Sequence, residues 1–256
     1  MLVRSWNLFH GNTHPPRRSV YLEEMVRLAT TDGPDVVALQ EVPAWALGRL
    51  AGWSGMTAVA DVAQPPRLGP VPITAGLGRA LTDLNPGLLR SAFSGQGNAI
   101  LLRPELAAVA HRSVTLNDAP FRREQAERLG LDLVTRLAWA KERRICQAVR
   151  LSNGMVVANL HATSSPGDPR IPAAELHRAV EFAEALAAAG DVVVVAGDFN
   201  CTAAHWALEG YSEPGPGIDH VTVRGAVPSP VRIWPDGRRL REGMLLSDHA
   251  PVELDL

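Results

Sequence analysis

Apolar residues recur along the chain with two different periods, which predict short strands in alternation with helices. Runs of five to ten residues that alternate, or that are apolar throughout, indicate strands. Such runs occupy residues 2–8, 35–40, 98–102, 107–116, 145–151, 155–160, 191–196, 218–223 and 251–256. Asn153-Gly154 separates two of them and predicts an antiparallel hairpin. The run at 107–116 is the one that we expect at the edge of a sheet.

A period near 3.6 residues and helix-starting residues indicate the helices. They are predicted at residues 17–31, 43–50 and 172–189. Gly190 is expected just beyond the end of the last one. Residues 52–97 are rich in Gly and Pro and predict short strands, a short helix and loops, whereas the mixed charges of 121–144 indicate a solvated helix or loop face. The pattern predicts mixed sheets covered by helices in one domain, residues 1–256.

Composition agrees with a single folded domain. The 256 residues are 46% hydrophobic and 20% charged, which is enough apolar material for a core and too much for disorder. No stretch approaches the roughly 18 apolar residues of a membrane span, and the N-terminal segment lacks the features of a signal peptide. Cys146 and Cys201 are too few for a disulfide framework, so we expect buried free thiols in a reducing compartment, the cytoplasm. A monomer is the default expectation.

The balance of charge gives no global attraction to nucleic acid. Lys and Arg number 25 and Asp and Glu 27, which leaves a net charge of −2. Lys141 is the only lysine among these bases, and biased genomic composition accounts for the excess of arginine. A local basic patch stays compatible with this total.

Polar side chains follow or close most of the predicted strands. These residues are Asn7, Glu41, His161, Asp198, Asn200, Asp219, Asp248 and His249. The carboxyl ends of strands in a layered α/β sheet meet at one rim, so these groups are expected to converge. Clustered carboxylates repel one another and suit Mg²⁺ or Mn²⁺, while histidines donate to phosphate or move protons near neutral pH. The chain has no Walker loop and no GxSxG nucleophile elbow.

The motifs SWN, LQE, GNAIL, NLH, GDFN, IDH and SDHAPV, in this order, resemble the endonuclease/exonuclease/phosphatase superfamily over residues 5–252. The resemblance implies a four-layer α/β sandwich, in which two mixed β-sheets pack face to face with helices outside. It also implies divalent-metal-dependent hydrolysis of a phosphate ester by in-line attack of water at one edge of the sandwich.

The resemblance also assigns roles to the polar residues at the strand ends. Glu41 is the principal metal ligand, with Asn7 and Asp248 beside it. Asp198 orients or deprotonates the attacking water, and Asn200 holds the phosphate or a second metal position.

Both histidines receive roles as well. His249 contacts the phosphate and is oriented by Asp219, and His161 donates to a phosphate oxygen or to the leaving group. Two positions depart from the pattern. Phe9 stands where some nucleases have a second acid, and no acid lies beside GNAIL to support His161, where Gln96 or Asn98 is the available substitute.

The substrate is open at this point. A nuclease-like activity on DNA or RNA is the first interpretation. A phosphatase or phosphodiesterase for a small molecule or lipid head group is the second, and an inactive binding module the third. Arginine can bind phosphate with two parallel hydrogen bonds, and tryptophan can stack on a base, so the loop at residues 224–241 is a candidate substrate contact. The alternative is that this loop is only solvated. The candidate substrate contacts are Arg170, Trp234, Arg238, Arg239 and Arg241.

Overall fold

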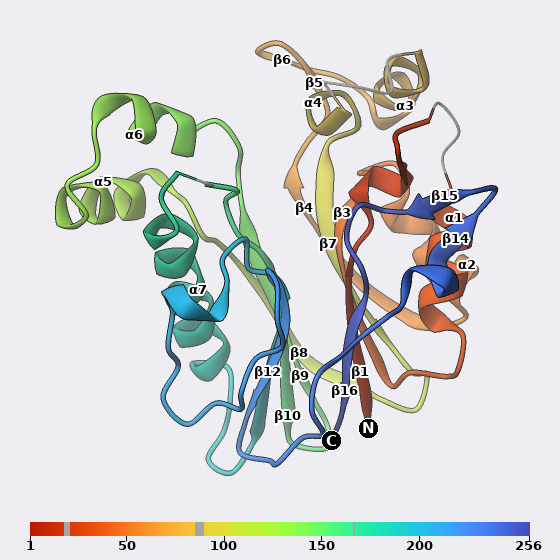
Figure 1. Ribbon diagram of the computed structural model, residues 1–256, viewed down its shortest axis with the longest axis vertical. Helices are drawn as coiled ribbons and strands as arrows, with labels where there is room; N and C mark the ends of the chain where they lie inside the picture. The colour runs from red at the N-terminus through yellow and green to blue at the C-terminus, as the bar shows by residue number, and fades with distance from the viewer. Residues whose placement is uncertain (18–20, 85–89, 166) are drawn as a thin grey trace.

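Two β-sheets pack face to face in the computed structural model, which describes residues 1–17, 21–84, 90–165 and 167–256 (Figure 1). The first sheet contains, in spatial order, β13 (Arg232–Ile233), β16 (Val252–Asp255), β1 (Leu2–Asn7), β3 (Val36–Val42), β7 (Gln96–Leu102) and β4 (Thr57–Gln64). The second contains β12 (Asp219–Arg224), β11 (Val192–Asp198), β10 (Met155–His161), β9 (Ile145–Leu151) and β8 (Ala108–Thr115). Pairs β1–β3 and β10–β11 are parallel and the others antiparallel, so both sheets are mixed.

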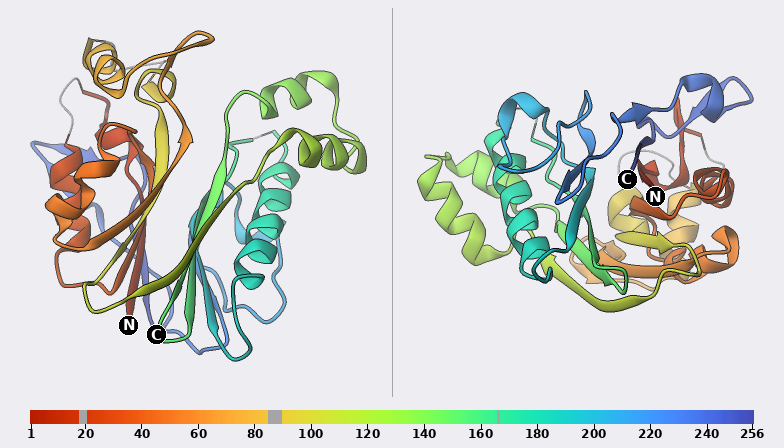
Figure 2. Two further views of the ribbon diagram at one scale, coloured as in Figure 1. Left: turned by 180° about the vertical axis from the view of Figure 1, so that it is seen from behind. Right: turned by 90° about the horizontal axis from the view of Figure 1, so that it is seen from below.

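Helices cover the outer face of each sheet and complete four layers (Figure 2). On the first sheet lie α1 (Leu22–Thr30) and α2 (Leu50–Ser54), whose apolar side chains share a core with Trp6 and Leu39. On the second sheet lies α7 (Arg170–Glu184), which packs its Leu176 and Ala179 against the outward residues of β10 and β11. A third core, built largely of valine, fills the space between the sheets. The predicted four-layer α/β sandwich is therefore confirmed.

Smaller elements extend the sandwich at one end. They are α3 (Ala75–Leu84), α4 (Arg90–Ser94), α5 (Ala119–Arg128), α6 (Leu133–Trp139), β5 (Arg67–Leu68) and β6 (Val71–Pro72). A three-stranded sheet of β14 (Leu240–Arg241), β15 (Met244–Leu246) and β2 (Thr13–His14) lies beside the first sheet. Both termini lie at the opposite end from α3 to α6 (Figure 1).

Several predicted elements differ from the observed ones. The helix predicted at 43–50 begins later, as a 3-10 turn (Leu47–Arg49) that continues into α2, because residues 43–46 form a turn. Helix α7 ends at Glu184, so Gly190 is not the residue after the helix; it has φ +87 in the turn before β11. The 17–31 helix begins at Leu22, and residues 18–20 lie outside the described residues.

The inward face of the strands changes from apolar to polar along their length. On β3 and β10 the inward series run from Val36 to Gln40 and from Val157 to Asn159. The Gln40 side-chain amide donates to Asn159 Oδ1 at 2.8 Å, and the Asn159 amide donates to the carbonyl oxygens of Leu39 and Ala99, each at 2.9 Å. These buried hydrogen bonds join the two sheets directly, because Asn159 belongs to one sheet and its partners to the other. They form a polar floor just below the sheet edge.

Across the described residues, none of the helices combines the length and apolar character that crossing a bilayer requires. Cys146 and Cys201 are both buried and free, as expected. The assignment of the whole chain to a single domain stays a prediction.

We predict that Asn159→Leu lowers the free energy of unfolding by about 3 kcal/mol. The substitution removes both amide donors from the Leu39 and Ala99 carbonyls and leaves the Gln40 amide without its closest acceptor. Urea denaturation monitored by circular dichroism measures the change. A loss below about 0.5 kcal/mol would show that the polar floor contributes little to stability.

Candidate active site

The strand register brings the predicted polar residues together at one sheet edge. Asn7 ends β1, while His161 and Asp198 end the parallel strands β10 and β11 and are paired across them. Asp219 begins β12 opposite Asp198, because that pair is antiparallel. Asp248 and His249 lie in the turn before β16. The eight side chains expected to converge therefore come from both sheets and from the loops at the same edge.

Unusual backbone conformations aim several of these side chains. Glu41, Asn200 and Ser247 have φ values of +53, +51 and +62, in the left-handed region that non-glycine residues seldom adopt. At Glu41 the register between β3 and β7 also shifts, so a bulge turns its carboxylate away from the strand's regular alternation. Strained conformations of this kind concentrate at functional sites. A Cβ at Gly197 would overlap the Leu160 carbonyl oxygen, which explains why glycine precedes Asp198.

The turn that carries Asp248 and His249 is tied to the first sheet by hydrogen bonds. Ser247 Oγ donates to the Asn7 carbonyl at 2.7 Å, and the Trp6 indole donates to the His249 carbonyl at 2.9 Å. The buried guanidinium of Arg239 also holds this turn, because it donates to the Ser247 carbonyl at 2.8 Å. Both Trp6 and Arg239 thus fix the position of His249, although neither reaches the open side of the edge.

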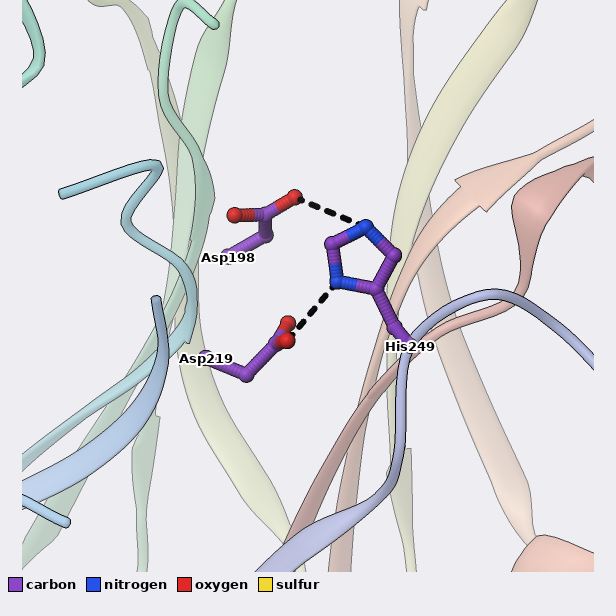
Figure 3. A group of neighbouring side chains, drawn as sticks. All are labelled: Asp198, Asp219 and His249. Carbon is purple, nitrogen blue, oxygen red and sulfur yellow. Dashed lines mark hydrogen bonds and ion pairs between the residues drawn. The ribbon is translucent and has the colours of Figure 1, made fainter. Parts of the chain in front are cut away.

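His249 lies between two aspartates of the opposite sheet (Figure 3). Its Nδ1 is 2.7 Å from Asp219 Oδ2, and its Nε2 is 3.9 Å from Asp198 Oδ2. Burial alone would lower the pKa of His249, but the hydrogen bond and charge of Asp219, with Asp198 and Asp248, raise it to about 10. The ring is therefore an imidazolium at neutral pH, with its Nε2–H directed into the site.

Asp198 is the most buried carboxylate of the group. Its Oδ2 accepts from the Asn7 side-chain amide at 3.0 Å, and its Oδ1 accepts from the Asn200 backbone N–H at 3.0 Å. Burial and the neighbouring Asp219 carboxylate raise the pKa of Asp198 well above its usual range. The Asn200 side chain donates to the Ala162 carbonyl at 2.9 Å, which joins the loops that follow β10 and β11.

Glu41 and Asp248 form the more open part of the acidic cluster. Glu41 lies 3.4 Å from His10 Nε2 and 3.8 Å from His161 Nε2. Burial, and then the charge of Glu41, raise the pKa of Asp248. A cation bound between these two carboxylates would remove that repulsion.

Distance alone also selects a second possible cation position in the described part of the chain. Ligand atoms of Asp198, Asp219 and His249 lie within 4.8 Å of one another. The hydrogen bond between His249 Nδ1 and Asp219 Oδ2, at 2.7 Å, is one that metal-bound histidines commonly make, so this trio is the alternative cation position. The assignment of Glu41 and Asp248, with Asn7 beside them, as metal ligands stays a prediction.

His161 has an arginine, not a carboxylate, as its neighbour. Arg144 Nη1 lies 3.0 Å from both ring nitrogens of His161, and Arg144 Nη2 donates to Glu142 at 2.7 Å. Burial and the charge of Arg144 lower the pKa of His161 well below its ordinary value, so the ring is neutral. Of the two expected substitutes for the missing acid, Asn98 turns its amide to the Ile145 and Asn159 carbonyls, and Arg144 is the side chain in contact with His161.

Two residues of the site were missed from the sequence. Arg144 could have been found from the predicted hairpin, because pairing of Leu160 with Cys146 places the residue before β9 beside His161. His10, in the loop after β1, is buried, and its contact with Glu41 depends on a left-handed turn with φ +54 that no sequence signal indicates.

The structure places the candidate substrate contacts away from these side chains or engages them with acids. Trp234 is buried, with its ring 3.5 Å from the Arg238 guanidinium carbon. Salt bridges join Arg238 to Asp32, Arg241 to Glu24, Arg239 to Asp236 and Arg170 to Asp168. Their assignment to substrate binding stays a prediction.

Comparison with known proteins supports the same fold. Solved structures that resemble the chain include the following three, and their low identities mean that each shows the fold alone. Truncated TDP2 from Caenorhabditis elegans is 14% identical, with a TM-score of 0.63, and the match covers 99% of this chain and 95% of that one. The D. rerio TDP2 complexed with single strand DNA product is 14% identical, with a TM-score of 0.63 and coverages of 99% and 97%. An endonuclease/exonuclease/phosphatase from Beutenbergia cavernae DSM 12333 is 17% identical, with a TM-score of 0.64 and coverages of 100% and 71%.

Among curated proteins, none matches the sequence significantly. The model of the endonuclease/exonuclease/phosphatase family, however, matches residues 5–249. That range contains both sheets' central strands and every side chain of the acidic edge from Asn7 to His249. The chain belongs to the endonuclease/exonuclease/phosphatase family.

Proposed function

We propose that the chain hydrolyses a phosphodiester with the help of a divalent cation, by in-line attack of water. The observation that carries the proposal is the convergence of four carboxylates, two carboxamides and two histidines at one sheet edge, with the two histidines in opposite charge states. Membership of a family of phosphoric ester hydrolases supports the reaction class.

Glu41 and Asp248 would hold the cation, with the Asn7 side-chain oxygen beside them. The donor set fits Mg²⁺ or Mn²⁺, because all three offer hard oxygen atoms and the two carboxylates repel each other without a cation. When bound, such an ion polarises a phosphoryl oxygen.

Asp198 is proposed to orient the attacking water and to accept its proton. The Asn7 amide and the Asn200 N–H fix the carboxylate in place, and its raised pKa makes it a stronger base than an exposed aspartate. Asn200 lies beside it and is proposed to hold the phosphate or a second metal position.

The two histidines are proposed to serve different oxygens of the phosphate. His249, held as an imidazolium by Asp219, donates from Nε2 to a non-bridging oxygen, where negative charge builds up. His161 is neutral, and Arg144 supplies the positive charge behind it. A neutral ring that donates from Nε2 suits a phosphate oxygen or the leaving group.

A nucleic acid, DNA or RNA, is the substrate that we propose first. The support is the likeness of the fold to a structure of D. rerio TDP2 complexed with single strand DNA product. A small molecule or lipid head group that contains a phosphate ester is the alternative. A cytoplasmic location and a monomeric state stay predictions.

We predict that cleavage of a single-stranded oligonucleotide and of bis-p-nitrophenyl phosphate requires Mg²⁺ or Mn²⁺ and stops in excess EDTA. Glu41→Gln should weaken Mn²⁺ binding at least about tenfold, because one anionic ligand is lost. Isothermal titration calorimetry measures the affinity. Glu105→Gln, an exposed acid after the far end of β7, is the matched control and should bind Mn²⁺ like the unaltered chain. Full activity in EDTA, or equal affinities of the two variants, would contradict the metal assignment.

We predict that His249→Ala reduces kcat/KM by about 100- to 1000-fold, and Asp219→Asn by about tenfold to 100-fold. The double variant should be about as impaired as His249→Ala alone, because both residues act through one imidazole. Steady-state kinetics of the four proteins complete the cycle. Losses that multiply would mean that Asp219 acts independently of His249.

A further inference from the structure

A hollow of about 270 Å³ is lined by Arg144, the neighbour of His161, and the reaction proposed above does not use it. Its walls are the end of α6, the segment before β9 and the loop after β10. Arg144, Lys141 and Glu142 line one side, and the hydroxyl-bearing residues Thr163 and Ser164 line the other. Two cationic groups and one carboxylate give this lining a net charge of +1.

The hydrogen bonding of buried Arg144 suggests that the hollow binds a ligand. The residue is only 6% exposed, and its three guanidinium nitrogens differ in what they contact. Nη1 contacts His161, Nη2 donates to Glu142, and Nε has no hydrogen-bond partner. A buried guanidinium N–H without an acceptor is costly, and an anionic oxygen in the hollow would satisfy it.

The walls of the hollow are fixed before any ligand arrives. The buried carboxylate of Glu175, on α7, accepts from the Trp139 indole at 2.5 Å. The same carboxylate accepts from the Thr163 backbone N–H at 2.6 Å and from the Thr163 hydroxyl at 2.7 Å. Glu175 thus clamps α6 to the loop after β10, and a site held in this way loses little entropy on binding.

A line of contacts joins the hollow to the reacting centre. Arg144 lies 3.0 Å from His161, and His161 Nε2 lies 3.5 Å from Asp198 Oδ2. The hollow and the reacting centre are therefore linked through two adjoining side chains, Arg144 and His161. Two neighbouring phosphates of one strand would be held at such adjacent sites.

We propose that this hollow is an anion subsite that takes a second phosphate of the substrate, one nucleoside away from the phosphate that is cleaved. The inference rests on the proposed function and narrows its substrate class. Substrates with two neighbouring phosphates, as in a nucleic acid strand, bind better than an isolated phosphodiester. The charge that selects them comes from Arg144 and Lys141, although the net charge of the chain is −2.

The composition of the chain offers a direct probe of the site. Lys141 is the only lysine, so a reagent that acetylates primary amines modifies Lys141 and the N-terminal amine alone. Lys141 is exposed at the hollow, whereas the Met1 amine lies at the opposite end of the sandwich, beside the Leu256 carbonyl. Peptide mass spectrometry measures both rates in one sample, and the Met1 rate is the internal reference.

The ligands are thymidine, its 5′- and 3′-monophosphates, and thymidine 3′,5′-bisphosphate, each added with Mg²⁺ to the Asp198→Asn variant to prevent turnover. The bisphosphate fills both phosphate positions whichever direction the strand runs. We expect it to slow Lys141 acetylation relative to Met1, with half-protection at about tenfold lower concentration than either monophosphate. Thymidine should protect neither amine. Equal protection by bisphosphate and monophosphates would overturn the proposal.

Paired substitutions locate the effect. Adding Arg144→Gln should raise the half-protecting concentration of bisphosphate about tenfold, while Arg143→Gln should leave it unchanged. Arg143 is the matched control, because its exposed guanidinium donates to Thr115 outside the hollow. Should Arg144→Gln misfold, Ser164→Asp places a repelling charge at the mouth of the hollow and should have the same effect. If bisphosphate protects Lys141 equally in all variants, the subsite is refuted. If the unaltered chain hydrolyses no phosphodiester substrate but bisphosphate still protects Lys141, only the proposed function is refuted.

Discussion

Mutual repulsion between carboxylates is the constraint on which the architecture of the site depends. Four acidic side chains meet at the edge of two facing sheets, where burial makes their negative charges costlier than in water. The space between the sheets changes from apolar to polar toward this edge, in three steps. Valine fills the space between them at the far end, a floor of buried amides built around Gln40 and Asn159 joins them nearer the edge, and only then do the acids begin. The amide floor lets polar groups approach from both sheets, because the side-chain amides of Gln40 and Asn159 find acceptors in it.

Burial and neighbouring charges give the two histidines different charge states. His249 faces Asp219 and Asp198 and is held as an imidazolium, while His161 faces Arg144 and is held neutral. Three aspartates raise the pKa of His249 against the effect of burial, whereas burial and then the charge of Arg144 lower the pKa of His161. Arg144 also connects the reacting centre to the hollow at Lys141, and a single buried guanidinium thereby serves both the histidine and the subsite.

The sequence was informative where side-chain alternation determines position. Extending the inward alternation of each strand to its end selects Asn7, His161 and Asp198, and all three lie at the predicted edge. Prediction failed where tertiary contacts decide the outcome. The lengths of α2 and α7 depend on packing, and the contact of Arg144 with His161 depends on the hairpin register. The hydrogen bond from Arg239 to the Ser247 carbonyl depends on a loop with no periodic pattern. Charge counts alone could not distinguish arginines that face substrate from arginines paired with Asp32 or Glu24.

The position of the bound cation tests the account most directly. Anomalous diffraction from crystals soaked in Mn²⁺ would locate it without assuming any substrate. The account predicts one strong peak at about 2.1 Å from carboxylate oxygens of both Glu41 and Asp248, with Asp219 still bonded to His249. A peak enclosed by Asp198, Asp219 and His249 with Glu41 uninvolved, or no peak at saturating Mn²⁺, would contradict it.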